Sequence, residues 1–192
     1  MAYKTKYSPL HIPFEVGYPY GVVDSGYECG WHTGVDIPQS GTGTIAPELY
    51  SVSEDGIVTY VYKNSNGSSP ALGNQVQIYD NRTHLYYRYC HMLYGSVTLN
   101  VGDHVDLNTL IGRMGATGNV TGAHLHLEAT TAKAWACQNF TDPCAPLGFP
   151  NIRGTEVEWD STDPPIPPIP EVIKKSKFNW AIRNAIKRNR IY

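Results

Sequence analysis

Short apolar runs separated by Gly, Asn, Asp and Ser fill the chain from residue 17 to about residue 130. The clearest runs are rich in Val, Ile, Tyr and Thr and lie at 56–62, 75–79, 84–91 and 123–128. Runs of this length with turn residues between them indicate β-strands rather than helices. We therefore predict a mainly β domain over residues 17–150, an antiparallel sheet or sandwich, preceded by an N-terminal arm at residues 1–16.

The pattern changes near Asp160. The stretch from Asp160 to Pro170 is dominated by prolines, which lack an amide donor and fix the backbone, so residues 151–170 are predicted to form a Pro-rich linker. Beyond it, apolar residues at helical spacing stand among Lys and Arg. Residues 171–192 are therefore predicted to form a basic, helical tail.

The formal net charge of −2 hides an uneven distribution. Residues 1–170 carry eight Lys and Arg against sixteen Asp and Glu, whereas residues 171–192 carry seven against one. An acidic body binds nucleic acid poorly, so no nucleic-acid partner is expected. The tail is a candidate anchor for an anionic wall polymer, a membrane surface or a phage structural protein; a solvated helix without a partner is the alternative.

The first residues contain no apolar run long enough for a signal peptide, and no stretch of the chain is long and apolar enough to span a membrane. We expect a protein made in the cytoplasm without a signal peptide.

Four cysteines allow two disulfides. Cys137 and Cys144 bracket a short loop that a disulfide could close, and Cys29 and Cys90 each lie close to a histidine considered below. The candidate pairs are Cys137–Cys144 and Cys29–Cys90. Reduced thiols that fill space, or zinc ligation by Cys29 or Cys90, are the alternatives.

Two groups of polar residues stand out against this background. His32 and Asp36 are four positions apart and fall on the same side of an extended or a helical backbone. Further on, His124, His126 and Glu128 alternate with leucines, so in a strand they share one face while the leucines face the core. Such a face either meets solvent or converges on a ligand.

A further candidate is His91, at the end of the aromatic run 84–91. Catalytic zinc takes three protein ligands from His, Asp or Glu and leaves the fourth position to water. Calcium and magnesium require more carboxylate oxygens than these residues supply. The helical HExxH motif of many zinc proteases is absent from the sequence.

Together these residues resemble the lysostaphin/LytM-type zinc endopeptidases. That family pairs an HxxxD element with a later HxH element, and this chain has His32 and Asp36 followed by His124 and His126. The stretch that ends at His91 fits the family's Tyr-x-His element. Segments 101–105, 110–118 and 121–128 are also similar to the family's closing region.

The resemblance implies a function for each residue. His32, Asp36 and His126 would bind one Zn²⁺ per chain. His91 and His124 would be the catalytic histidines, which polarise or deprotonate the attacking water and stabilise the oxyanion.

Two further residues are assigned more loosely. Glu128 would orient one of the histidines, with a solvated edge position as the alternative, and Tyr27 would lie near the oxyanion.

The implied substrate is the peptide cross-links of bacterial peptidoglycan, bound in an open groove with loop 63–70 as one wall. Without a signal peptide the chain is similar to bacteriophage enzymes that reach the wall at lysis or within the virion. Two other functions stay open. The chain could be a non-catalytic cell-wall-binding module, or a structural virion module whose zinc site is closed by a cysteine.

Overall fold

The protein is described by a computed structural model that covers residues 1–161. Residues 162–170 of the predicted linker and the whole predicted tail, residues 171–192, lie outside the described residues. No helix among residues 1–161 is long and apolar enough to cross a membrane.

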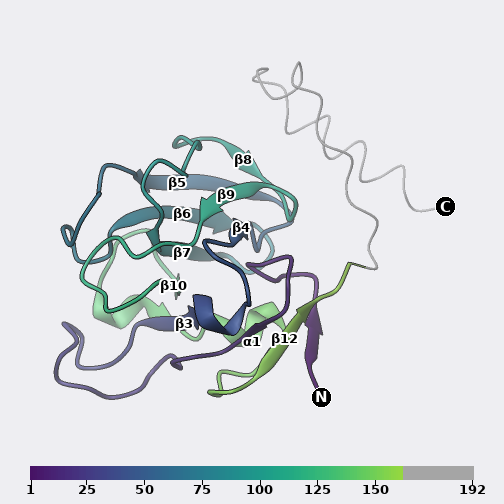
Figure 1. Cartoon of the computed structure of the whole chain (residues 1–192). Coiled ribbons are helices and arrows are strands. Elements are labelled where there is room, and N and C mark those ends of the chain that lie inside the picture. The colour runs from purple at the N-terminus through teal and green to yellow at the C-terminus, as the bar shows by residue number, and fades with distance from the viewer. Residues whose placement is uncertain (162–192) are drawn as a thin grey trace.

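The main element is a seven-stranded sheet in which every strand pair is antiparallel. Its strands follow the order β11-β10-β7-β6-β5-β8, and β3 pairs with β10 beside that path (Figure 1). The bounds are β3 Gly34–Pro38, β5 Gly56–Tyr62, β6 Asn74–Asp80, β7 Leu85–Met92, β8 His104–Val105, β10 His124–Thr130 and β11 Phe140–Thr141. The prediction of a mainly β, antiparallel domain is confirmed.

The remaining elements are short. A two-stranded sheet joins β4 to β9, and a three-stranded sheet has the order β1-β12-β2. Their bounds are β1 Tyr3–Thr5, β2 Phe14–Glu15, β4 Glu48–Tyr50, β9 Leu110–Arg113 and β12 Glu156–Trp159; the helical turns are η1 Gln39–Gly41, η2 Cys137–Asn139 and α1 Cys144–Leu147.

The three-stranded sheet differs from the predicted domain boundaries. β1 runs parallel to β12, and β2 pairs with the opposite edge of β12, so residues assigned to an arm and to a linker form one sheet. Leu10, Phe14, Val16 and Val157 from these segments are buried in the hydrophobic core. Residues 1–16 and 151–160 therefore belong to the folded body.

The centre of β10 determines where the functional residues lie. His126 faces Asp36 across the β3 pairing and Cys90 across the β7 pairing, so three strands meet at this point. Leu125 and Leu127 are fully buried on the core side, as the alternation predicts. The opposite face of β10 thus carries the titratable residues.

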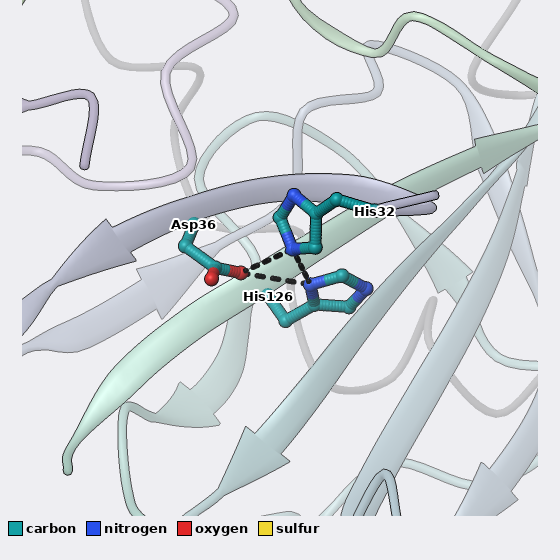
Figure 2. Close-up of side chains that lie close together, drawn as sticks. All are labelled: His32, Asp36 and His126. Atoms are coloured by element: carbon teal, nitrogen blue, oxygen red, sulfur yellow. Dashed lines mark hydrogen bonds and ion pairs between the residues drawn. The ribbon is translucent and has the colours of Figure 1, made fainter. Parts of the chain in front are cut away.

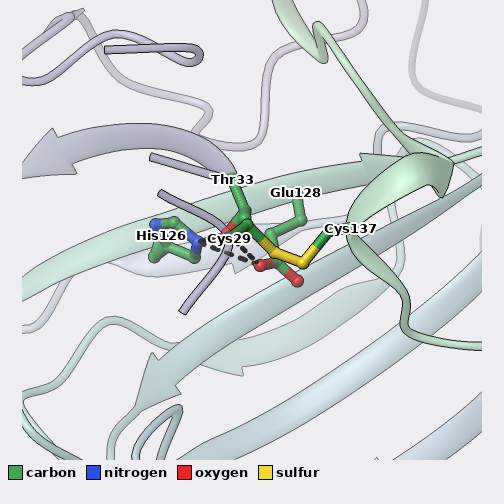
Figure 3. The surroundings of a disulfide bond; sticks show 5 residues. All are labelled: Cys29, Thr33, His126, Glu128 and Cys137. Carbon is green, nitrogen blue, oxygen red and sulfur yellow. Dashed lines mark hydrogen bonds and ion pairs between the residues drawn. A yellow bond between two sulfur atoms is a disulfide. The ribbon is translucent and has the colours of Figure 1, made fainter. Parts of the chain in front are cut away.

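Both predicted disulfides are wrong, because the single disulfide of residues 1–161 joins Cys29 to Cys137 (Figure 3). Cys90 and Cys144 are free and buried. Cys90 is enclosed within the central sheet on β7, and Cys144 lies in the hydrophobic core at the start of α1. The pairing that occurs depends on two loops, before β3 and after β10, that meet only in the folded sheet.

Candidate metal centre

His32, Asp36 and His126 point one donor atom each toward a common position (Figure 2). His126 Nδ1 lies 2.8 Å from Asp36 Oδ1 and 3.1 Å from His32 Nε2, and His32 Nε2 lies 3.1 Å from Asp36 Oδ1. Among the residues that the structure describes, the donor atoms of these three side chains are close enough together to hold a metal ion.

The strand pairing brings these side chains together. Asp36 on β3 is the direct partner of His126 on β10, and His32 lies two residues before the start of β3, four positions before Asp36. Gly34 provides space for the imidazole, because a Cβ at this position would lie 2.9 Å from the His126 ring and 2.6 Å from the carbonyl oxygen of Leu127.

Hydrogen bonds on the outer sides of both rings indicate which nitrogen carries the proton. His32 Nδ1 lies 2.8 Å from the carbonyl oxygen of Pro19, which can only accept, so Nδ1 donates. His126 Nε2 likewise donates to Glu128 Oε1 at 3.2 Å. The other nitrogen of each ring therefore turns its lone pair toward the carboxylate of Asp36. Three electron-rich atoms about 3 Å apart repel one another unless positive charge lies among them.

The electrostatics of the site favour that positive charge. Burial alone would raise the pKa of Asp36, but hydrogen bonds from His126 and His32 outweigh it and hold the pKa far below its usual range. Burial would also lower the pKa of His126, but the hydrogen bonds to Asp36 and Glu128 raise it to about 10. Positive charge beside the Asp36 carboxylate is thus strongly stabilised.

The donor set fits zinc. Two imidazoles and one carboxylate, bound at about 2.0–2.2 Å with tetrahedral angles, would stand about 3.3 Å from one another. The observed separations of 2.8–3.1 Å are only a few tenths of an ångström shorter. Three protein ligands leave the fourth tetrahedral position open, which is the arrangement of catalytic rather than structural zinc.

His91 and His124 lie beside this group with their rings 4.7 Å apart. His91 Nδ1 donates to the carbonyl oxygen of Thr117 at 2.9 Å, and His124 Nδ1 donates to that of Gly122 at 2.9 Å. Each ring therefore keeps Nε2 as its basic nitrogen. His124 Nε2 lies 3.7 Å from Asp36 Oδ1, which places this nitrogen at the border of the metal centre.

His91 is held in an unusual conformation. Its φ of 58° lies in the left-handed region, which costs a residue with a side chain of order 1 kcal/mol. The backbone N–H of His91 donates to Leu72, and the ring is fixed by Thr117. Burial, and then the charges of His126 and His124, lower the pKa of His91 to about 4. This imidazole is therefore neutral, and able to accept a proton, at neutral pH.

The two loosely assigned residues are both near the centre. Glu128 is fully buried and bonded to His126, so it is not a solvated edge residue. The Tyr27 ring lies 5.3 Å from the His32 ring, and Tyr18 contacts the same ring edge-on at 4.9 Å. Sequence reasoning missed Tyr18; the glycine before it and its place at the start of the apolar pattern were the available signals.

Loop 63–70 is anchored on the side of His91. The amide of Gly118 donates to the carbonyl oxygen of Gly67 at 2.7 Å, directly after the Thr117 that holds the His91 ring. Buried Ser65 also bonds to Asn74. The loop is thus joined to the segment that positions a candidate catalytic histidine, and its role as a groove wall stays a prediction.

Two curated proteins are similar to part of this chain. Lysostaphin of Staphylococcus simulans is 30% identical over 115 residues, which cover 60% of this chain and 21% of that protein. Glycyl-glycine endopeptidase ALE-1 of Staphylococcus capitis is 29% identical over 118 residues, which cover 62% and 30%. The chain spans less than a third of the length of these relatives.

Solved structures show the same fold. The catalytic domain of the antimicrobial peptidase lysostaphin from Staphylococcus simulans matches with a TM-score of 0.54 and 27% identity, covering 68% of this chain and 89% of that domain. A zinc-containing peptidase from Vibrio cholerae matches with a TM-score of 0.51 and 25% identity, covering 65% and 36%.

The family model described as Peptidase family M23 matches residues 30–138. This range contains the three converging donor residues, His91 and His124, and it spans more than half of the sequence. The chain therefore belongs to peptidase family M23.

Proposed function

We propose that this chain is a zinc-dependent endopeptidase that hydrolyses peptide cross-links of bacterial peptidoglycan by attack of water. The observation that carries this proposal is the convergence of three lone pairs, from His32, Asp36 and His126, beside two imidazoles with free Nε2 atoms. The names of the relatives, an antimicrobial peptidase and a glycyl-glycine endopeptidase, support the substrate class.

The residues divide the chemistry between them. His32, Asp36 and His126 would hold the zinc ion, which would act as a Lewis acid and lower the pKa of a bound water to about 7. His91 and His124 flank the ligands on one side, so one Nε2 would accept a proton from the attacking water. The other ring would donate to the oxyanion on the scissile carbonyl only in its protonated form, with a proton on Nε2 as well as on Nδ1. Neutral His91 suits the role of proton acceptor.

The two alternatives are less well supported. A closed structural site needs a fourth protein ligand, usually a cysteine, but Cys29 is in a disulfide. The donor group formed within residues 1–161 contains no cysteine. A binding module without activity would be expected to lack one of the ligands, whereas all three are present and converge.

The test is to measure bound zinc per chain and clearing of purified peptidoglycan for the wild type, His126→Ala and His91→Ala. We expect His126→Ala to lose zinc, and His91→Ala to keep zinc but lose turnover. A wild-type protein that binds no zinc, or a His91→Ala variant that clears walls at the wild-type rate, would refute the proposal.

We also propose that the enzyme acts outside the cytoplasm, because a disulfide such as Cys29–Cys137 persists in oxidising surroundings. Release at phage lysis and transport within a virion both fit this. The basic residues 171–192 would hold the enzyme on an anionic surface. Deleting residues 162–192 should weaken sedimentation with intact cells while cleavage of soluble peptides continues; unchanged sedimentation would remove the anchor from the proposal.

A further inference from the structure

A second carboxylate lies directly behind the metal centre. Glu128 follows His126 by two residues on β10, shares its face of the strand and is fully buried. Its Oε1 accepts a hydrogen bond from the hydroxyl of Thr33 at 2.7 Å and from His126 Nε2 at 3.2 Å. Figure 3 shows the contacts of this carboxylate with Thr33 and His126 as dashed lines, in the surroundings of the Cys29–Cys137 disulfide.

The neighbouring strands enclose this carboxylate. Glu128 pairs with Gly34 on β3, which has no side chain, and with Arg88 on β7. Arg88 is itself 8% exposed, and its Nη1 lies 3.8 Å from Glu128 Oε2. The carboxylate is therefore shielded from water, and its charge is balanced by the guanidinium of Arg88.

The hydrogen bonds of Glu128 are unequally distributed. Oε1 takes both short bonds, to Thr33 and His126, whereas Oε2 makes none within the described part of the chain. Burying a charge costs free energy unless it is paired and hydrogen-bonded. A carboxylate that served only to pair with Arg88 would turn its oxygens toward the guanidinium at closer range. Its hydrogen bonds go to Thr33 and to the imidazole of His126 instead.

We propose that Glu128 is a positioning residue for the metal ligand His126 and that Thr33 and Arg88 hold the carboxylate in place. The inference rests on the proposed zinc-dependent function. By accepting the hydrogen bond from Nε2–H, Glu128 favours the His126 tautomer in which Nδ1 carries the lone pair. The same bond holds the ring in the orientation that turns Nδ1 toward Asp36 and His32. Partners of this kind behind a metal ligand commonly change metal affinity by about 10–100-fold.

The test compares zinc affinity in full-length variants, measured by competition with a chromophoric chelator. Glu128→Gln keeps the shape but removes the charge and lets the amide turn either way, so we expect about tenfold weaker binding. Thr33→Val removes one of the two short hydrogen bonds and should weaken binding less. Thr130→Val is the matched control, since Thr130 is a buried residue on the same strand whose hydroxyl bonds only to Ala132. It should leave zinc affinity unchanged.

A second readout separates positioning from general stability. Nitrogen-15 NMR of the zinc-bound protein detects the Nε2–H of His126, which should exchange slowly with water in the wild type and in Thr130→Val because Glu128 accepts its hydrogen bond. In Glu128→Gln this proton should exchange faster. This signal does not depend on turnover.

The outcomes distinguish this inference from the proposed function. If Glu128→Gln and Thr33→Val bind zinc as tightly as the wild type, and the Nε2–H of His126 exchanges equally slowly, Glu128 is not a positioning residue, although the enzyme proposal stands. If the wild type binds no zinc, the proposed function fails first. Should Glu128→Gln not fold, Thr33→Val decides alone, because unchanged affinity in that variant overturns the inference.

Discussion

Reduction of the Cys29–Cys137 disulfide is expected to lower the free energy of unfolding by several kcal/mol. The two cysteines are 108 residues apart. In the chain-entropy model, a crosslink that closes about 100 residues stabilises by about 4.7 kcal/mol, and measured values are more often about 2–4 kcal/mol. Each kcal/mol corresponds to about 2–4 °C in the unfolding midpoint of a chain of this size. The midpoint should therefore fall by about 5–15 °C.

Reduction of the disulfide should also weaken metal binding, because the disulfide lies close to the ligand His32 in the chain. The hydrogen bonds that residues 21–31 make within the described structure are to one another or to His32. The disulfide at Cys29 is thus the covalent link that ties this loop to the segment after β10, and it lies three residues before His32. Reduction should speed the loss of zinc to a chelator.

The assay is thermal unfolding and chelator-induced zinc release with and without a phosphine reductant. The control is the double variant Cys29→Ser, Cys137→Ser, which should resemble the reduced wild type and should not respond to the reductant. Four thiols counted in the denatured, reduced wild type would prove complete reduction. If the midpoint then moves by less than about 2 °C, the disulfide does not stabilise the native state and the reasoning is wrong.

Three further perturbations test individual contacts. Gly34→Ala should weaken zinc binding roughly tenfold in a chelator competition, because its Cβ would meet backbone at 2.6 Å, whereas Gly122→Ala, with open space around it, should not. In chelator-treated protein, the free energy of unfolding should fall as the pH drops from about 6.5 toward 4, because folded His91, with its pKa of about 4, binds fewer protons than unfolded His91. Denaturant titrations at both pH values measure this loss, and it should be smaller in His91→Gln by up to about 3 kcal/mol. Phe14→Ala should cost about 3–5 kcal/mol in the same titration, because Phe14 is buried against Phe149.

Alternation along one strand was sufficient to predict the face of β10. Because β10 is long and has a core on one side, its leucines and its titratable residues separate with the period of two that a strand imposes. The same pattern could not decide whether Glu128 meets solvent or a neighbour. The surroundings of Glu128 depend on β3 and β7, which flank β10 on either side in the folded sheet.

Other features had no local signal at all. β1 and β2 contain two or three residues each, too few to show a period, and the partner of both strands lies near the other end of the described chain. The pairing of Cys29 with Cys137 likewise depends on a contact between distant loops. Thr33 and Arg88 became recognisable only as neighbours of Glu128, although an arginine within an aromatic strand was visible in the sequence.

The sheet formed by β1, β12 and β2 means that the stretch shared with other peptidases is smaller than the unit that folds. A fragment cut to residues 30–138 would lack this sheet and would expose the core surface that Phe14, Phe149 and Val157 now cover. It would also leave Cys137 as an unpaired thiol. A fusion protein built from this domain therefore needs the segments on both sides of residues 30–138 as well.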